Sequence, residues 1–336
     1  MRMIVAFAIS QTDTLARAGR GGEAEALLLR AGEGGDAQAL THLATWRLLG
    51  QPVPRDLAEA RRLLSRARQM GDVPAAVMEA ALTANGSGSA PDWAGAVALL
   101  REAAGRDPVA AGHLALLNAM ALDAEGAPLA LPEPEALVSG GRVVRFRKLL
   151  TPAECEHIAR GAMDLMQPAV VVDQDTGQEF RHPHRTSDGG VIGPTRETLP
   201  IQAINRRIAA ISGTNMGQGE SLTVLRYAPG QEFRPHSDTL PGTNNQRIVT
   251  VLLYLNQGFG GGETVFPRHG VTVTPAGGDA LLFTNTLADG KLDPHALHAG
   301  LPVRSGVKWL ATRWIRARPF SAWTGPDAAA QKDAAA

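Results

Sequence analysis

The first third of the chain has alanine and leucine at three- and four-residue spacing, which is the pattern of amphipathic helices. Residues 56–67 align with residues 92–103, which lie 36 positions further on, and with residues 20–31, which lie 36 positions earlier. Asp56 and Asp92 open two of these segments, and aspartate is a good N-cap. Single helical hairpins cannot bury their apolar faces, so units of this kind stack. The pattern predicts a helical repeat domain over residues 1–125.

The second half alternates apolar and polar positions over short runs separated by glycine- and proline-rich turns. Helices are expected to begin at Thr151-Pro152 and to cover 199–212. Strands are predicted over 142–146, 221–227, 247–255, 270–274, 279–284 and 308–316. The predicted fold class is multi-domain α + β, with an N-terminal α-helical repeat solenoid followed by a double-stranded β-helix (jelly roll) with flanking helices.

The two predicted domains are separated by a segment rich in proline and glycine. Residues 126–141 contain three prolines and end in two glycines, which is typical of a linker. The β-rich domain is therefore expected over residues 142–320. Residues 321–336 are rich in small and polar residues, and we expect them to form a disordered tail.

The balance of positive and negative residues argues against a nucleic-acid partner. The chain has 33 lysines and arginines against 33 aspartates and glutamates, so no nucleic-acid partner is expected. No run approaches the ~20 apolar residues of a membrane span. The short apolar run at residues 3–9 has no clear cleavage pattern after it, so we expect a cytoplasmic protein without a membrane partner. The single cysteine, Cys155, excludes an intrachain disulfide and is interpreted as a packing residue.

The chemical signal begins with His236 and Asp238. Two residues at i and i+2 on a strand project from the same face, so both side chains could bind one ion. A third ligand is expected from a distant strand, and His298 is the candidate. Two histidines and one carboxylate form the facial triad of non-haem Fe(II) oxygenases. His295 is the alternative third ligand, although Asp293 and a proline before it indicate a turn.

Lys308 lies in an apolar strand between Val307 and Trp309, which predicts a buried cation. A buried ammonium near an iron site needs an anionic partner. A dicarboxylate such as 2-oxoglutarate could bind iron at one end and pair with Lys308 at the other.

Residues 142–318, taken together, resemble the prolyl 4-hydroxylase family of Fe(II)/2-oxoglutarate dioxygenases. The resemblance rests on an ordered set of positions: Tyr227 nine residues before His236, the His236-x-Asp238 pair, Gly261-Gly-Glu-Thr264, His298 with Lys308 ten residues later, and Trp314. Lysine at position 308, where other members of the superfamily commonly have arginine, also favours this family. The N-terminal repeats are similar to SEL-type tetratricopeptide-like repeats.

The resemblance implies a role for each matching residue. It implies three Fe(II) ligands, namely His236, Asp238 and His298. It implies that 2-oxoglutarate contacts Lys308, Tyr227 and Thr264, with Lys308 anchoring its distal carboxylate. It implies substrate contacts from Arg247, Trp314 and Arg185, the last in a loop that folds over a bound peptide. Dioxygen is the second co-substrate, and the need for ascorbate is left open.

Three of these residues have a structural alternative. Tyr227 and Trp314 could be core aromatics, and Arg247 could be one partner of a salt bridge. The resemblance implies hydroxylation of a prolyl residue in a peptide or protein, and we expect the helical repeats to help to dock that chain. The alternatives are hydroxylation of another side chain or a small molecule, a repeat-based adaptor with an inactive oxygenase domain, and a cupin-like metal protein, which gives no reason for Lys308.

Overall fold

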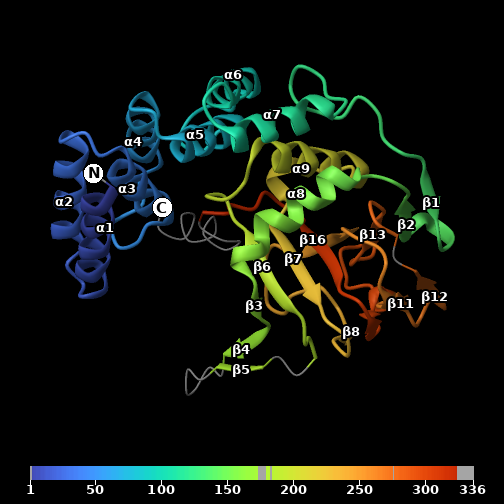
Figure 1. Cartoon of the computed structure of the whole chain (residues 1–336). Coiled ribbons are helices and arrows are strands. Elements are labelled where there is room, and N and C mark those ends of the chain that lie inside the picture. The colour runs from blue at the N-terminus through green and yellow to red at the C-terminus, as the bar shows by residue number, and fades with distance from the viewer. Residues whose placement is uncertain (1, 173–178, 182–183, 275, 324–336) are drawn as a thin grey trace. The chain divides into compact units, whose positions relative to one another are not determined.

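The protein divides into two compact units in the computed structural model (Figure 1). The structure describes residues 2–172, 179–181, 184–274 and 276–323. The first unit contains Met1–Leu129 and Pro194–Ile204, and the second contains Ala130–Gly193 and Asn205–Ala336. Among the described residues, no helix combines the length and the apolar character that crossing a bilayer requires.

The first unit is a series of antiparallel helices in which each helix packs on the next (Figure 1). Its helices are α1 (Arg2–Arg17), α2 (Gly21–Glu33), α3 (Ala37–Leu49), α4 (Leu57–Gln69), α5 (Val73–Asn85), α6 (Trp93–Ala104) and α7 (Pro108–Ala119). Helices α2, α4 and α6 begin at residues 21, 57 and 93, so the 36-residue period of the sequence is the period of the structure. The predicted helical repeat is confirmed.

Aspartate caps and small apolar residues define each hairpin. The side chain of Asp56 accepts a hydrogen bond from the Glu59 amide at 2.8 Å, and that of Asp92 accepts one from the Gly95 amide at 2.8 Å. These bonds satisfy amides that the first turn of a helix leaves unpaired. Most of the alanines and leucines that match between repeats are buried in α2, α4 and α6: Ala24, Leu28, Ala60, Leu63, Leu64, Ala67, Ala96, Leu100 and Ala103.

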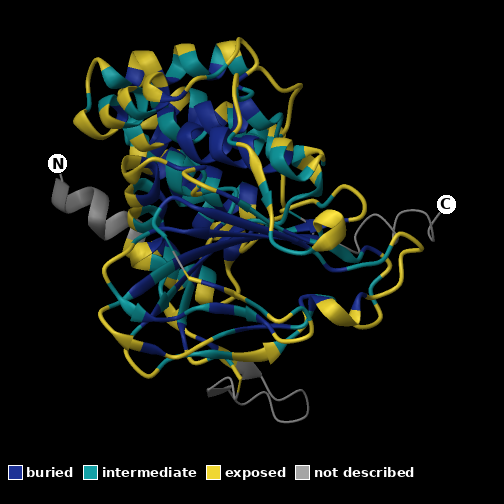
Figure 2. Ribbon diagram, turned by 90° about the vertical axis from the view of Figure 1, so that its right-hand side faces the viewer, coloured by how far each residue is buried: buried dark blue, intermediate teal, exposed yellow. Residues whose placement is uncertain are grey.

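The second unit is built on an eight-stranded antiparallel sheet whose strands are mostly buried (Figure 2). The strand order is β1-β2-β13-β9-β16-β7-β6-β3. The bounds are β1 (Pro134–Ala136), β2 (Val143–Phe146), β3 (Gln167–Pro168), β6 (Asp188–Ile192), β7 (Leu222–Tyr227), β9 (Arg247–Tyr254), β13 (Ala280–Thr284) and β16 (Lys308–Arg316). The long strands β9 and β16 occupy the centre, and nearly all of their side chains are buried or half-buried.

A second sheet has the order β12-β11-β14-β8, and two strand pairs, β10-β15 and β4-β5, complete the strands. Their bounds are β4 (Val170–Val172), β5 (Glu179–Arg181), β8 (Phe233–His236), β10 (Gly260–Gly261), β11 (Thr264–Phe266), β12 (Val271–Val273), β14 (His298–Gly300) and β15 (Val303–Ser305). Sheets of eight and four strands with flanking helices confirm the predicted β-rich domain. Most strands of the second sheet have only three residues, too short to show an alternation in the sequence.

The helices of the second half of the chain are α8 (Pro152–Ala162), α9 (Leu199–Ser212) and the 3₁₀ turns η1 (Ser139–Gly141), η2 (Met163–Leu165), η3 (Met216–Gln218) and η4 (Pro294–Ala296). Thr151 and Glu154 form a capping box at the start of α8, which contacts β6 and β7. Glu154 also accepts two hydrogen bonds of 2.9 Å from the buried guanidinium of Arg207. The early turns of α9 belong to the first unit, where the Gln202 amide donates to the Ala81 carbonyl at 2.7 Å.

The predicted linker forms part of the large sheet, and the predicted tail is largely outside the described residues. Residues 126–141, predicted as a linker, contain β1, which adds an edge strand to the large sheet by pairing with β2. An edge strand tolerates Pro134 because one side of it needs no hydrogen-bond donors. Most of the predicted disordered tail, residues 324–336, lies outside the described residues, as do residues 173–178 and 182–183.

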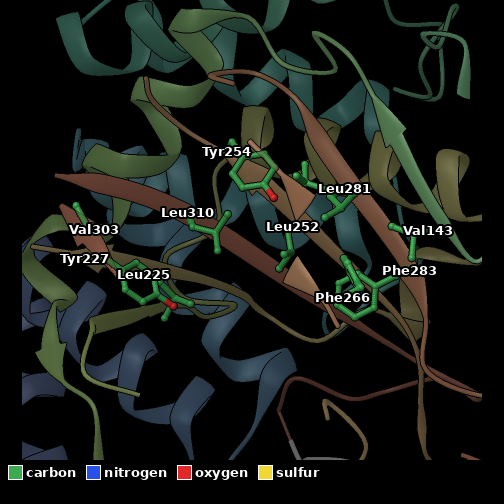
Figure 3. Packing of buried hydrophobic residues seen from close by; sticks show 11 residues of the cluster. Val143, Leu225, Tyr227, Leu252, Tyr254, Phe266, Leu281, Phe283, Val303 and Leu310 are labelled. Atoms are coloured by element: carbon green, nitrogen blue, oxygen red, sulfur yellow. The ribbon is translucent and has the colours of Figure 1, made fainter. Parts of the chain in front are cut away.

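The core between the two sheets is aromatic and branched-aliphatic (Figure 3). Phe266 from β11 and Phe283 from β13 meet edge to face with ring centroids 5.1 Å apart, which joins the second sheet to the first. The other members include Leu225, Tyr227, Leu252, Tyr254 and Leu310. Cys155 is buried beside this core, and burial raises the pKa of its thiol to about 11, which fits the predicted packing role.

Candidate active site

Two strands of the smaller sheet bring the two predicted histidine ligands together. His236 ends β8 and His298 begins β14, and the antiparallel register places these residues directly opposite each other. Their ring centroids are 4.2 Å apart. The two histidines are 62 positions apart in the sequence but form one cross-strand pair in the sheet.

Asp238 completes the cluster from the loop that follows β8. Its carboxylate oxygens lie 3.7 Å from the Nε2 atom of His236 and 3.7 Å from the Nε2 atom of His298. One ligand atom from each of the three residues lies within 4.8 Å of the others. The prediction that these three residues meet is confirmed, but strand β8 ends at His236, so Asp238 is not on the strand. It is instead held by a hydrogen bond from Thr250 at 2.7 Å.

Backbone carbonyls fix the orientation of both imidazoles. The Nδ1 atom of His236 is 2.8 Å from the carbonyl oxygen of Arg234, and the Nδ1 atom of His298 is 3.0 Å from that of Ala296. A carbonyl only accepts, so each Nδ1 carries the proton. Each Nε2 is therefore the ring nitrogen that faces Asp238, and it is the nitrogen left to bind a metal, as in metal-binding histidines.

Burial sets the charge of the cluster. Burial, together with the nearby His298, lowers the pKa of His236 to about 4, so this imidazole is neutral at neutral pH. Burial alone would raise the pKa of Asp238, but the two imidazoles and the Thr250 hydroxyl outweigh it and hold that pKa below its ordinary value. Neutral imidazole nitrogens and an ionised carboxylate are the donor set that a divalent transition metal requires.

His295 does not join this cluster. Its side chain is exposed, and its ring lies 5.2 Å from the ring of His269. His298, in contrast, is 4% exposed and stacks near Phe266 and Phe283. Of the two histidines left open by the sequence, the structure brings His298 to Asp238.

An inner pocket extends to Lys308 from the cluster of His236, Asp238 and His298, which we call the metal cluster because these side chains could hold a metal ion. Its wall combines the cluster with Tyr227, Thr264 and Lys308, and with the apolar side chains of Leu225, Leu252 and Leu310. Figure 3 shows the apolar part of this wall, with Leu225, Tyr227, Leu252 and Leu310 on neighbouring strands. Lys308 begins β16 directly opposite Tyr227 on β7, so the strand register places both residues at one end of the pocket.

Lys308 is a buried cation with few partners. Its side chain is 2% exposed, and Nζ donates to the carbonyl oxygen of Gly262 at 2.7 Å. The Nζ atom also faces the rings of Tyr227 and Tyr254, at 5.4 and 5.6 Å. Burial lowers the pKa of Lys308 to about 8, against the opposing effect of Glu263. The site thus has an ammonium group whose charge is not neutralised by direct contact with a carboxylate among the described residues.

Gly262 has to be glycine for this arrangement. Its φ of +70° lies in the left-handed region, and a Cβ atom there would come within 3.0 Å of Cδ of Lys308. Nearby, Tyr254 donates its hydroxyl proton to Oγ1 of Thr264 at 2.8 Å, which leaves the Thr264 proton available for a ligand. Tyr254 was not predicted as part of the site, because its sequence context is that of an ordinary core strand.

An outer cavity of 400 Å³ lies on the other side of the cluster. The three predicted substrate residues line it, together with four other residues and with His236 and Asp238 of the cluster: His184, Arg185, Phe233, Pro235, His236, Ser237, Asp238, Arg247 and Trp314. Arg185, Phe233 and Trp314 also line the inner pocket, so the two spaces meet at the metal cluster. The ring of Phe233 stacks on that of His236 at 3.4 Å, an aromatic contact that the sequence did not indicate.

The alternative interpretation of Arg247, a salt bridge, is present in the structure. Its guanidinium donates two hydrogen bonds to Glu220, at 2.7 and 2.9 Å, and lies 3.9 Å above the ring of Trp314. Tyr227 belongs to the hydrophobic core and also lines the inner pocket. Trp314 is half-buried and lines both cavities. Arg247 nevertheless remains on the wall of the outer cavity, so the two interpretations coexist.

Comparison with known proteins agrees with this geometry. Residues 222–316 match the model of the 2OG-Fe(II) oxygenase superfamily. Prolyl 4-hydroxylase 1 of Arabidopsis thaliana is 37% identical over 218 residues, which cover 59% of this chain and 77% of that protein. Prolyl 4-hydroxylase 5 of the same plant is 36% identical over 203 residues, which cover 53% of this chain and 69% of that protein.

Among solved structures, the viral collagen prolyl hydroxylase of Paramecium Bursaria Chlorella virus-1 is similar, with a TM-score of 0.44 and 27% identity over 54% of this chain and 99% of that one. The chain belongs to the prolyl 4-hydroxylase family of Fe(II)- and 2-oxoglutarate-dependent oxygenases.

Proposed function

We propose that the protein is an Fe(II)- and 2-oxoglutarate-dependent dioxygenase that hydroxylates a prolyl residue of a peptide or protein. The observation that supports this most directly is that a His-Asp-His cluster and a buried ammonium group share one pocket. A metal protein without a diacid co-substrate would gain nothing from Lys308, because burying an unneutralised cation costs free energy. An inactive oxygenase shell would have no need to keep the complete cluster.

The residues of the cluster fit Fe(II). We assign His236, Asp238 and His298 as its ligands, because they offer two imidazole nitrogens and one carboxylate oxygen within 4.8 Å of one another. Three protein ligands leave positions open for other molecules, which is the arrangement of non-haem iron oxygenases. The bound metal would supply activation of dioxygen coupled to oxidative decarboxylation of 2-oxoglutarate.

The inner pocket suits the five-carbon diacid. We assign Lys308 to its distal carboxylate, with the Tyr227 and Thr264 hydroxyls as further donors. The Thr264 proton is free to donate because Tyr254 already supplies a proton to its oxygen. The apolar side chains of Leu225, Leu252 and Leu310 would enclose the methylene groups and exclude water from the chemistry.

The outer cavity is assigned to the substrate. Tyr227 lines the inner pocket and not this cavity. Burial raises the pKa of Tyr227 to about 12, so this residue stays a neutral hydrogen-bond donor and is no candidate for a base. We propose that Trp314 and Phe233 form the apolar walls beside the target residue, and that Arg185 and Arg247 contact the peptide backbone. A role of the repeats in docking the rest of that chain, a requirement for ascorbate, a jelly-roll connection of the sheets and a cytoplasmic location stay predictions.

The test uses the purified full chain with Fe(II), 2-oxoglutarate, air and a proline-rich peptide. We expect succinate release that depends on both Fe(II) and peptide, with the mass of one oxygen atom added to a proline. The matched control is the same peptide with alanine at each proline, which should give only background succinate. Equal succinate with both peptides and no oxygen on either would refute the prolyl substrate, and no succinate from any substrate would refute the oxygenase.

A further inference from the structure

We propose that Thr250 and Asn285 act as a positioning relay that aims the carboxylate of Asp238 at the metal. This inference rests on the proposed function, since it concerns the orientation of one proposed ligand. Oδ2 of Asp238 accepts a hydrogen bond from Oγ1 of Thr250 at 2.7 Å. The same Oγ1 atom of Thr250 accepts a hydrogen bond from Nδ2 of Asn285 at 2.9 Å. Thr250 and Asn285 are both fully buried, so water does not compete for these bonds.

The direction of both hydrogen bonds follows from counting protons. An ionised carboxylate has no proton, so the 2.7 Å contact requires Thr250 to donate its single hydroxyl proton to Asp238. Thr250 then has only lone pairs left, so Asn285 has to turn its NH₂ group toward it. If the amide of Asn285 were reversed, its carbonyl oxygen would need the same proton. With the NH₂ group of Asn285 on its oxygen, the Thr250 hydroxyl keeps its proton for Asp238.

The backbone holds this relay in place. Thr250 lies in β9 between its register partners in β13 and β16, at the centre of the large sheet. Asn285 directly follows β13. Its backbone N–H donates to the backbone carbonyl of Ile248 at 2.8 Å, and its backbone carbonyl accepts from the backbone N–H of Asp293 at 2.9 Å. The backbone of Thr250 is fixed by a central strand. A hydrogen bond from its hydroxyl therefore holds the Asp238 carboxylate in place relative to the sheet.

Asp238 needs such support more than the other two ligands do. His236 and His298 are in paired strands, and each ring is fixed by a backbone carbonyl. Asp238 lies in the loop after β8, so its carboxylate depends on other side chains for orientation. The hydrogen bond from Thr250 holds the carboxylate in an orientation in which each oxygen faces one of the two imidazoles. Partners of this kind contribute to metal affinity without touching the metal.

The test is a Co(II) titration of the metal-free full chain by calorimetry and by the visible absorption of bound Co(II). Thr250→Val keeps the shape but removes the proton, and it should weaken Co(II) binding ~10–100-fold and change the absorption of bound Co(II). Thr250→Ser restores the hydroxyl and should return the affinity to within about threefold of the wild type. The matched control is Thr223→Val, at a buried threonine of β7 that lines neither cavity.

Asn285→Ala tests the second bond of the relay. It should weaken Co(II) binding in the wild-type background and add little once Thr250→Val is present, because the two residues act in series. The thermal unfolding of the metal-free variants separates metal affinity from folding. If Thr250→Val fails to fold, Asn285→Ala alone decides, and an unchanged Co(II) affinity would overturn the relay.

Three other results would overturn the proposal: wild-type affinity and absorption in Thr250→Val, no recovery in Thr250→Ser, or an equal loss in Thr223→Val. Asp238→Ala separates this proposal from the assignment of the metal site. If Asp238→Ala binds Co(II) as tightly as the wild type does, the ligand assignment itself is wrong. If Asp238→Ala loses Co(II) and Thr250→Val does not, only the relay is wrong.

Discussion

The inner pocket and the outer cavity meet at the same metal cluster but are built differently. The inner pocket ends in Lys308, a fully buried cation whose hydrogen bond goes to a backbone carbonyl. The outer cavity is lined by Arg247, a cation that already forms two hydrogen bonds with Glu220 and stacks on Trp314. A charge held without a counter-ion is suited to one anionic ligand, whereas a charge already paired mainly supports the wall.

This difference means that substitutions on the two sides should have different consequences. In the inner pocket the loss of a charge should affect 2-oxoglutarate and leave folding intact. In the outer cavity the loss of a charge should affect folding and peptide binding together. The metal cluster belongs to both spaces, so its loss should remove all activity.

The largest effect is expected from Asp238→Ala. It removes the only charged member of the cluster, so we expect iron-dependent succinate release to fall at least ~1,000-fold. Co(II) binding to the metal-free protein should be lost as well. The control is Asp289→Ala, at an exposed loop aspartate whose partner is Lys291. Turnover by Asp238→Ala within a few-fold of the wild type would contradict the ligand assignment.

Lys308→Met should have the next largest effect. A hydrogen bond to a charged group contributes about 1.5–3 kcal/mol, so the KM for 2-oxoglutarate should rise ~10–150-fold. The peptide KM should change little. The thermal midpoint of the metal-free protein should stay the same or rise, because the variant no longer buries a cation.

The control for Lys308→Met is Lys291→Met, at an exposed lysine. A fall in the thermal midpoint together with an unchanged KM for 2-oxoglutarate would show that Lys308 has a structural role instead. That outcome would also remove the difference between the two sides of the cluster.

His236, Asp238 and His298 could be predicted from the sequence because their order and spacing match those of a known family. Lys308 also lies between Val307 and Trp309, which predicts burial, and burial of such a group needs a reason. The long strands β7, β9 and β16 were predictable because each spans six to nine residues in which apolar side chains predominate.

The residues around the cluster were less predictable. Thr250 is one polar residue in the apolar run of β9, and Asn285 follows a strand where a turn residue is ordinary. Their function depends on contact between residues 35 positions apart, and no local pattern records that contact. A strand was expected at His236 and another at His298, but the bounds of β8, β11 and β14 were not predicted, because three or four residues define no periodicity.

The pH dependence of 2-oxoglutarate binding should have an effect of about tenfold. Burial lowers the pKa of Lys308 to about 8, and the diacid binds the protonated form. The binding contributed by Lys308 is therefore complete below pH 8 and is lost as the pH rises through 8. Affinity at pH 9 should be ~10-fold weaker than at pH 7. Calorimetry with the Co(II)-loaded protein would measure it.

Lys308→Arg is the matched variant for this titration. Arginine stays charged across this range, so any affinity that it retains should not fall between pH 7 and pH 9. An equal decline in the wild type and in Lys308→Arg would assign the pH dependence to another group. A flat wild-type curve would mean that Lys308 stays charged despite its burial.

The smallest effect is expected on the outer side, from Arg247→Lys. Lysine keeps the charge but cannot form both hydrogen bonds to Glu220, so one bond of ~1 kcal/mol should be lost. Glu220 keeps its contact with Arg316 at 2.5 Å, which limits the damage. We expect a peptide KM raised about fivefold, a slightly lower thermal midpoint and an unchanged KM for 2-oxoglutarate.

Arg226→Lys is the control for Arg247→Lys, because Arg226 forms an ion pair with Asp188 away from both cavities. It should leave the peptide KM unchanged. If Arg247→Lys instead raises the KM for 2-oxoglutarate as much as Lys308→Met does, the outer wall reaches into the inner pocket. The two sides of the metal cluster would then form one binding site, because a cation already paired with Glu220 would be recognising the diacid.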